Sequence, residues 1–392
     1  MASTHRIAVI QWHIKELDPE YNHATACNYI SEAAAQGAEL AVLPEYHLSG
    51  MVPTDPLWTV QAGKSAEYLA NYQRLAKKLQ ICIVPGTIIE KHTGPDQSTL
   101  LYNTAYFISN DGTVLGSYRK KNIWHPERPY LTSSGSEPHV AIDTPIGRVG
   151  MMICWDLAFP EAFRELIVDG AEIVIVPTYW TPHDASPEAR AYNPDSEALF
   201  LESTITSRCF ENTCGIVFVN AAGPSEDFLG LSQITLPLVG SIAKMGTEEG
   251  FVVADLDMGP IEAAERNYKI HWKWSLSPYL TARNALLRLS HLSCQHPHSR
   301  GTSCPLRPNT LWASSLWLLI LHLCCALCGI KTNPCSLKQP LPQTLYHLHV
   351  AAISLPPITN SNLDCSLQIP GNSVSHFQSA FLATCCMCPP LH

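Results

Sequence analysis

Three short segments of this 392-residue chain carry side chains that could act together on a carbon–nitrogen bond. They are Leu43-Pro44-Glu45, Tyr118-Arg119-Lys120 and Met152-Ile153-Cys154-Trp155-Asp156. Each segment joins a reactive side chain to a run of residues with the character of a buried β-strand. A carboxylate, an ammonium group and a thiol are the groups needed to hydrolyse such a bond through a thioester. The sequence therefore indicates a type of chemistry before it indicates a substrate.

The three groups would have complementary tasks. A thiol needs a nearby base or cation to become a thiolate, and a partly buried Glu45 could accept its proton near neutral pH. Lys120 could lower the pKa of the Cys154 thiol and stabilise a developing oxyanion. Taken singly, each has an ordinary interpretation: a solvated loop glutamate, a cysteine that fills the core, and a lysine in a basic surface cluster with Arg119 and Lys121.

Strands and helices alternate along residues 6–255, which predicts a sheet covered by helices. Strands are expected at 6–11, 39–43, 81–86, 101–109, 114–119, 149–153, 172–177, 215–220, 232–236 and 251–255, and helices at 22–36, 65–79, 160–168 and 196–210. Asn110-Asp111-Gly112 between two of these strands is a strong hairpin signal, so the α/β fold should contain mixed rather than purely parallel sheets.

Composition divides the chain near residue 270. Residues 1–270 hold 18 basic and 33 acidic residues, a net charge of −15, whereas the rest holds seven basic residues and the single acid Asp364. We therefore expect one domain at 5–270 and an atypical tail at 271–392. A domain this acidic has no electrostatic reason to bind nucleic acid or an anionic membrane surface.

Cysteine usage changes at the same place. Five cysteines are scattered through the first part, and the other ten crowd into the tail. The N-terminus leads directly into the apolar run Ile7–Ile10, which is too short for the core of a signal peptide. We therefore expect a cytoplasmic protein with free thiols.

The tail is rich in Leu, Pro, Ser, His and Cys and has no amphipathic period, so we expect it to be irregular, without a core of its own. Translated intron or out-of-frame sequence would have this composition. A membrane anchor at Leu311–Ile330 is the main alternative. A zinc site at Cys324, Cys325 and Cys328 is a weaker one, because a second matched pair is missing.

Residues 5–270 resemble the carbon–nitrogen hydrolase (nitrilase) superfamily. The resemblance rests on the segments around Glu45, Lys120 and Cys154, and on weaker matches further along the chain. It implies a four-layer α-β-β-α sandwich, with Cys154 as nucleophile, Glu45 as general base and Lys120 as oxyanion stabiliser. It also implies a second glutamate at Glu127, whose alternative interpretation is a salt-bridged loop carboxylate. The backbone N–H of Trp155 would share the oxyanion with Lys120.

The same resemblance implies no metal or organic cofactor, and pairing of subunits into a homo-oligomer. The spacing of His47, His125 and His139 supports no metal site either, so we interpret them as surface or supporting residues. Trp155 resembles the nitrilase branch, whereas Asp156 resembles the amidase and carbamoylase branches.

We place an amidase or N-carbamoyl amidohydrolase first and a nitrilase second, so the expected partner is a small amide, carbamoyl compound or nitrile. An acyltransferase or a non-catalytic binding protein on the same scaffold stays open. The loops Tyr46–Trp58, Asn122–Tyr130 and Tyr179–Asn193 should shape the pocket, where Tyr179, Trp180 and Tyr192 could line the wall.

Overall fold

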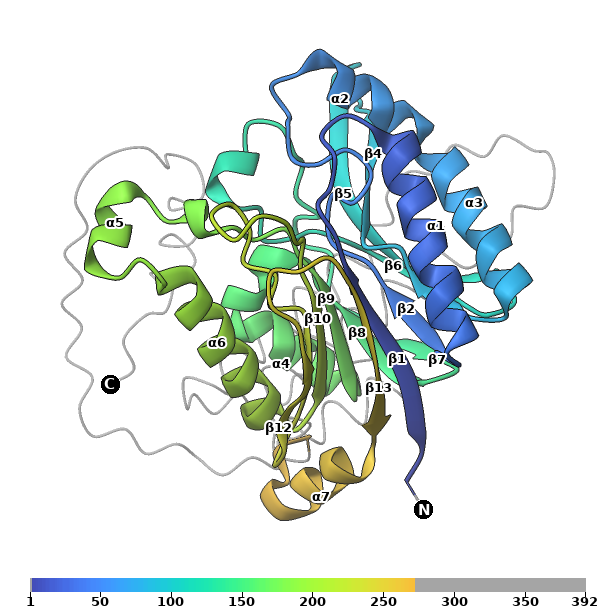
Figure 1. Cartoon of the computed structure of the whole chain (residues 1–392), viewed down its shortest axis with the longest axis vertical. Coiled ribbons are helices and arrows are strands. Elements are labelled where there is room, and N and C mark those ends of the chain that lie inside the picture. The colour runs from blue at the N-terminus through green and yellow to red at the C-terminus, as the bar shows by residue number, and fades with distance from the viewer. Residues whose placement is uncertain (1, 272–392) are drawn as a thin grey trace, which may run out of the picture. The chain divides into compact units, whose positions relative to one another are not determined.

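A computed structural model describes residues 2–271. Two mixed β-sheets lie face to face, and helices cover the outer face of each sheet (Figure 1). The fold is therefore the four-layer α-β-β-α sandwich that the family resemblance implies. The predictions for the tail, including the apolar span at Leu311–Ile330 and the cysteine cluster near Cys324, lie outside the described residues.

The first sheet has seven strands in the order β13-β1-β2-β3-β5-β4, and β6 pairs with β5. Strand β1 is parallel to β2 and antiparallel to β13, and β5 is antiparallel to β3, β4 and β6. The strands are β1 (Thr4–Gln11), β2 (Leu40–Val42), β3 (Cys82–Val84), β4 (Thr87–Thr93), β5 (Thr99–Ile108), β6 (Val114–Arg119) and β13 (Gly250–Asp257).

The second sheet has six strands in the order β12-β11-β10-β9-β8-β7. Its central strands β8, β9 and β10 are parallel, and antiparallel strands close both edges. The strands are β7 (Ile142–Thr144), β8 (Gly147–Met151), β9 (Ile173–Pro177), β10 (Gly215–Val219), β11 (Gln233–Leu236) and β12 (Gly240–Lys244).

Helices α1 and α3 pack on the first sheet, and α6 packs on the second sheet beside α4 (Figure 1). The α-helices are α1 (Pro19–Ala35), α2 (Pro56–Gln61), α3 (Ser65–Leu79), α4 (Pro160–Val168), α5 (Pro187–Tyr192), α6 (Ser196–Asn212) and α7 (Gly259–Tyr268). Short 3₁₀ helices occur at η1 (Ala62–Lys64), η2 (His125–Glu127), η3 (Cys154–Ala158) and η4 (Pro182–Asp184). None of the helices in residues 2–271 is long and apolar enough to cross a membrane.

Successive apolar side chains of β1 contribute to two different hydrophobic cores, one between the sheets and one between the first sheet and its helices. Ile7 and Val9 pack in the core between the sheets, whereas Ala8 and Ile10 pack against α1, where Ile30 is fully buried. Successive side chains of a strand point to opposite faces, so an unbroken apolar strand can serve both layers. Removal of one such aliphatic side chain typically costs about 2–5 kcal/mol of stability.

The predicted elements recur with small shifts at their ends. The predicted helices 65–79 and 160–168 are observed with the same bounds, and β5 and β6 form the predicted hairpin, whose turn contains Gly112 at a φ of +88°. The five cysteines in the described residues are free thiols.

One difference affects the site: the strand predicted at 149–153 ends at Met151, because the chain turns sharply at Cys154. The strands and α-helices of residues 2–271 that were not predicted are β4, β7, β12, α2, α5 and α7.

Candidate active site

Glu45 lies in a turn just beyond β2, at the edge where the two sheets meet. Its backbone N–H donates to the carbonyl oxygen of Thr178, which follows β9 in the second sheet, at 3.2 Å. The side chain is fully buried. Its carboxylate accepts hydrogen bonds from Asn103 Nδ2 at 2.7 Å and from the Tyr179 backbone N–H at 2.9 Å. These contacts fix the carboxylate from both sheets.

Lys120 lies between two carboxylates. Its ammonium nitrogen is 2.8 Å from Glu45 Oε1 and 2.7 Å from Glu127 Oε1, and its side chain is fully buried. The residue directly follows β6, and its backbone N–H donates to the Asn103 carbonyl oxygen at 2.8 Å. A buried ion pair depends on its geometry and on its remaining hydrogen bonds, and here each of the two carboxylates accepts two hydrogen bonds besides the one from Lys120.

Glu127 is the last residue of the 3₁₀ helix η2, and its Oε1 lies 2.7 Å from the Lys120 ammonium nitrogen. Tyr46 donates its hydroxyl to Glu127 Oε1 at 2.5 Å, and the Trp124 backbone N–H donates to Oε2 at 2.9 Å. The Glu127 side chain is only 3% exposed. Glu127 is therefore salt-bridged to Lys120, and it belongs to a buried cluster formed by Glu45, Lys120 and Glu127.

Cys154 begins the 3₁₀ helix η3, three residues after β8 ends at Met151. Its φ of +48° is in the left-handed region, which residues other than glycine enter at a cost of about 1–3 kcal/mol and mostly at functional sites. The sulfur lies 4.0 Å from the carbonyl oxygen of Tyr179, the residue whose N–H binds Glu45. The turn thus presents the thiol next to the carboxylate cluster.

Asp156 connects the cysteine turn to the segments on either side of Lys120. Its fully buried carboxylate accepts hydrogen bonds from the Ile153 N–H at 3.0 Å, the Tyr118 hydroxyl at 2.8 Å, and the backbone and side chain of Asn122 at 3.0 and 2.8 Å. The motif that carries the thiol and the motif that carries the ammonium group are therefore held together by one carboxylate.

Burial and charge displace the pKa values in this cluster. Burial raises the pKa of Glu45 to about 7, although the Lys120 ammonium opposes the shift. Burial, and then the Glu45 charge, raise the pKa of the Cys154 thiol well above its ordinary value. Burial opposes ionisation of Lys120, but the Glu127 and Glu45 charges hold its pKa well above the ordinary value. The resting site thus keeps a protonated thiol beside a carboxylate that titrates near neutral pH.

Cys154 lines a cavity of about 120 Å³. All three loops predicted to shape the pocket contribute to it: Tyr46 from the first, Trp124 from the second, and Tyr179 and Trp180 from the third. Since one water needs about 10–15 Å³ of such space, the cavity admits a small organic group next to the thiol. The walls are mainly aromatic, which suits the apolar part of a ligand.

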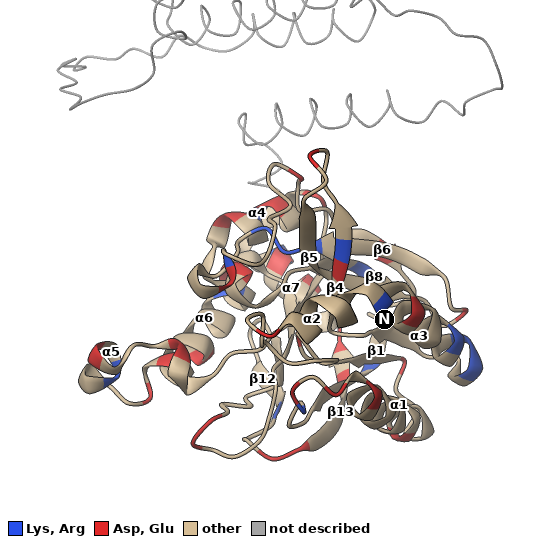
Figure 2. Ribbon diagram, turned by 90° about the horizontal axis from the view of Figure 1, so that it is seen from above, with Lys and Arg blue, Asp and Glu red and all other residues tan. Residues whose placement is uncertain are grey.

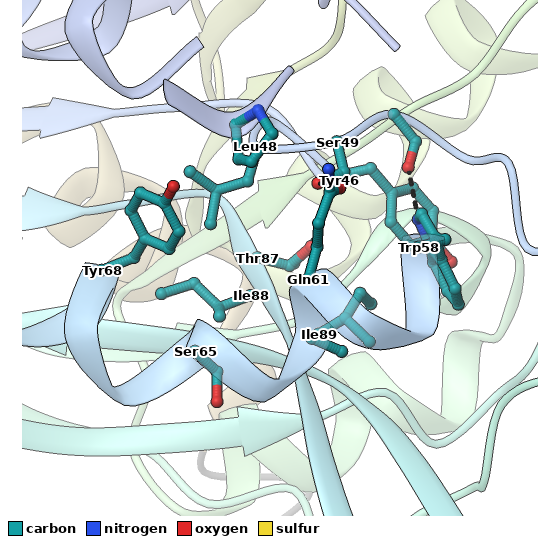
Figure 3. Close-up of a pocket in the computed structure, with 13 residues that line it drawn as sticks. Tyr46, Leu48, Ser49, Trp58, Gln61, Ser65, Tyr68, Thr87, Ile88 and Ile89 are labelled. Atoms are coloured by element: carbon teal, nitrogen blue, oxygen red, sulfur yellow. Dashed lines mark hydrogen bonds between the residues drawn. The ribbon is translucent and has the colours of Figure 1, made fainter. Parts of the chain in front are cut away.

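Tyr46 also lines a second cavity of about 30 Å³, shown in Figure 3. Its apolar walls include Leu48, Ile88 and Trp58, and the Trp58 indole donates to the Gly50 carbonyl oxygen at 2.9 Å. This space holds only a water or two. The packing around it fixes Tyr46, whose hydroxyl binds Glu127.

The structure brings together four of the residues that the sequence singled out: Glu45, Lys120, Glu127 and Cys154. The Trp155 side chain lines the cavity as well. Tyr192 does not, and that prediction is wrong, because the residue ends the surface helix α5 with 89% of its area exposed.

The predicted supporting histidines have different surroundings. His125 is exposed, whereas His47 is buried between the Thr87 carbonyl oxygen and the Tyr72 hydroxyl. His139 is buried against Tyr118. Within residues 2–271, no three or more His, Cys, Asp or Glu side chains are grouped so that they could hold a metal ion.

Sequence reasoning missed Asn103, which binds Glu45 through its side chain and Lys120 through its backbone. A signal was present, because an amide stands in the middle of the apolar strand β5 at an inward position. Buried polar groups need partners, so a polar residue at such a position suggests a network. Only the folded chain shows that the partner is 58 residues away.

The chain is similar to known proteins in sequence and in fold. The sequence model of the Carbon-nitrogen hydrolase family matches residues 6–266. Human omega-amidase NIT2 is 30% identical over 268 residues, which cover 64% of this chain and 88% of that protein. An (R)-stereoselective amidase of Pseudomonas sp. is 29% identical over 301 residues, covering 75% of this chain and 96% of the relative.

Solved structures share the fold. A carbon–nitrogen hydrolase from Helicobacter pylori superposes with a TM-score of 0.61 at 24% identity, covering 73% of this chain and 99% of that one. Saccharomyces cerevisiae Nit3 gives a TM-score of 0.58 at 25% identity, with 68% and 97% covered. This chain belongs to the carbon–nitrogen hydrolase family. It is a hydrolase of carbon–nitrogen bonds other than peptide bonds.

Proposed function

We propose that the protein hydrolyses a small amide through a thioester on Cys154, with Glu45 as general base and Lys120 as oxyanion stabiliser. The observation that carries the proposal is the buried Lys120 between Glu45 and Glu127, beside a thiol that opens into a cavity. An ammonium group held in this way provides a fixed positive charge where negative charge develops during attack on a carbonyl group.

The reaction follows from the position of each proton. Cys154 attacks the carbonyl carbon, and Glu45 accepts the thiol proton as the carbon–sulfur bond forms. Lys120 and the backbone N–H of Trp155 stabilise the oxyanion; the first N–H groups of a helical turn have no partner within that turn. Glu45 then returns the proton to the departing ammonia or amine, and the thioester remains.

Hydrolysis of the thioester reuses the same carboxylate. Glu45 takes a proton from water, the hydroxide attacks the thioester carbon, and the thiolate leaves and recovers that proton. The net change is amide plus water to carboxylic acid plus ammonia or amine. In this scheme Glu127 fixes Lys120, since its Oε1 is 2.7 Å from the ammonium nitrogen and its Oε2 is held by the backbone of Trp124.

Amides are placed ahead of nitriles because the named relatives include amidases. A nitrile would react at the same thiol, so product analysis must separate the two: an amidase releases acid from amides, whereas a nitrilase releases acid from nitriles. An acyltransferase would deliver the acyl group to an amine rather than to water, and a binding protein would form no covalent adduct.

The test is acyl trapping on the thiol. The protein is mixed with a panel of short amides, quenched in acid and examined by mass spectrometry, and released ammonia is measured in parallel. Cys154→Ala should abolish both adduct and ammonia, a loss of several orders of magnitude, since the covalent route disappears. Cys27→Ala, at a half-buried thiol on α1 away from the cavity, is the matched control and should retain both. Hydrolysis that survives in Cys154→Ala would refute the mechanism.

A further inference from the structure

The cavity beside Cys154 has one carboxylate that the proposed reaction does not use. Two acidic side chains line the cavity, Glu127 and Asp184. Glu127 is fully engaged with Lys120, Tyr46 and the Trp124 backbone. Asp184 accepts only from Thr181, at 2.8 Å from the hydroxyl and 3.3 Å from the backbone N–H, and it has no salt bridge to a basic side chain within residues 2–271.

The other cavity walls offer no positive charge. No arginine or lysine of the described part of the chain lines the cavity, and Lys120 is fully buried between two carboxylates. The remaining walls include Trp124, Trp155 and Trp180. Aromatic faces attract cations, and a partly buried carboxylate strengthens that preference. A substrate carboxylate bound beside Asp184 would meet a like charge, because the positive charge of Lys120 is held between Glu45 and Glu127.

We infer that the substrate is a small amide whose acyl chain carries an ammonium group, and that Asp184 is the residue that recognises this group. The inference rests on the amide hydrolysis proposed above and deepens it. The thiol attacks the amide carbonyl at one part of the cavity, while the charged end of the acyl chain binds the Asp184 carboxylate between aromatic walls. Figure 2 shows both acidic and basic residues along α5 and α6, which follow Asp184 in the chain; Arg190 of α5 lies 3.1 Å from the ring of His183.

Titration of Asp184 gives this recognition a pH dependence. Burial raises the pKa of Asp184 to about 6; the hydrogen bonds from Thr181 and the charge of Lys120 lower it, and the charge of Glu197 on α6 raises it. The adjacent His183 faces Asp227 instead, at 3.2 Å. Selectivity for the cationic substrate should therefore be weak below pH 6 and grow as the pH rises through 6, because only the ionised carboxylate attracts the ammonium group.

The experiment compares three amides that share a four-methylene spacer: 5-aminopentanamide, hexanamide and adipic acid monoamide. The ratio of kcat/KM for the cationic amide over the neutral one should be at least about tenfold at pH 8, and the anionic amide should be the poorest of the three. Asp184→Asn keeps a side chain that can cap the turn and should bring the ratio close to one. Asp227→Asn, an exposed acid outside the cavity wall, is the matched control and should leave the ratio unchanged.

The outcomes separate the two proposals. If no amide forms an acyl adduct, the proposed function fails. If the neutral or anionic amide reacts as well as the cationic one, amide hydrolysis stands and the assignment of Asp184 is wrong. The pH dependence of the ratio in the unaltered protein supplies a second measurement that needs no variant: a ratio that stays constant between pH 5 and 8 would also overturn the assignment.

Discussion

At the scale of the residue, the site is a small set of charges removed from water. Glu45, Lys120 and Glu127 carry two negative charges and one positive charge when all are ionised, and all three are almost completely buried. Burial disfavours the surplus negative charge, which is why the pKa of Glu45 rises to about 7. A base of this kind is suited to exchange protons with a thiol and with water near neutral pH.

The first prediction at this scale concerns pH. The value of kcat/KM for a neutral amide such as hexanamide should rise with pH, with an inflection near 7, because protonated Glu45 cannot accept the thiol proton. Alkylation of Cys154 by iodoacetamide should follow the same curve. In Glu45→Gln the inflection near 7 should vanish from the alkylation profile. A rate that is flat between pH 6 and 8 in the unaltered protein would exclude Glu45 as the base.

Lys120 gives a second prediction, on stability and activity together. Lys120→Ala leaves two buried carboxylates without their cation, which should destabilise the fold by about 3–5 kcal/mol. Loss of the oxyanion partner should lower kcat by about 100-fold or more. Lys64→Ala is the control, because its side chain is 51% exposed and its ion-pair partner Glu20 is 67% exposed; it should change stability by less than about 1 kcal/mol. Urea unfolding and steady-state kinetics measure both effects, and equal behaviour of the two variants would contradict the assignment.

At the scale of the element, tight turns just beyond strand ends position the reacting groups. Glu45 follows β2, Lys120 follows β6, and Cys154 follows β8 after a turn with positive φ. A strand fixed by hydrogen bonds on both sides gives such a turn a rigid base. The Asp156 carboxylate then ties the cysteine turn to the lysine segment, so neither segment can shift alone.

Gly86 offers a test of this arrangement. It has a φ of +56°, and a Cβ there would collide with the Pro44 carbonyl oxygen, directly before Glu45. Gly86→Ala should therefore displace the Glu45 turn, lower the melting temperature by several degrees and reduce amidase activity at least tenfold. Gly135→Ala is matched in backbone geometry, with a φ of +64° but open space around the position, so it should cost only the left-handed strain of about 1 kcal/mol. A Gly86 variant that behaves like the control would show that this close approach does not position Glu45.

At the scale of the whole molecule, the predicted domain and tail remain to be separated by experiment. The structure shows hydrogen bonds as far as His271, whose ring nitrogen lies 3.1 Å from the Asn212 carbonyl oxygen. We propose that residues 5–270 form the catalytic domain, that this domain assembles into a homo-oligomer, and that residues 272–392 contribute nothing to catalysis.

The corresponding prediction uses a chain that ends after His271, which keeps this contact. It should give a higher soluble yield than the full chain, because the removed sequence is apolar and has few charges. Its amidase activity per molecule should equal that of the full chain, and light scattering should show an oligomer in both. A truncated chain that is less soluble, inactive or monomeric would refute this division of the chain.

The sequence by itself determined many of the helices and strands of this protein and the side chains able to do chemistry, whereas the four-layer arrangement was implied by the family resemblance. The spacing of apolar residues and the turn residues between them largely decide local secondary structure. The hairpin at Asn110–Gly112 and the helices α3 and α4 could therefore be predicted from their own residues. The reactive identities of Glu45, Lys120 and Cys154 are likewise properties of single residues and their immediate neighbours.

Only the tertiary structure decided how these groups act on one another. Glu45 and Lys120 are 75 residues apart in the chain, but Glu45 Oε1 lies 2.8 Å from Lys120 Nζ. Asn103, on a strand without a recognisable motif, donates a hydrogen bond to the same Glu45 oxygen. Desolvation depends on what all the other segments place around a group, so the shifted pKa of Glu45 cannot be obtained from neighbours in sequence. The same holds for Asp184, which is one acid among many in the sequence and enters the cavity only because the loop after β9 folds over Cys154.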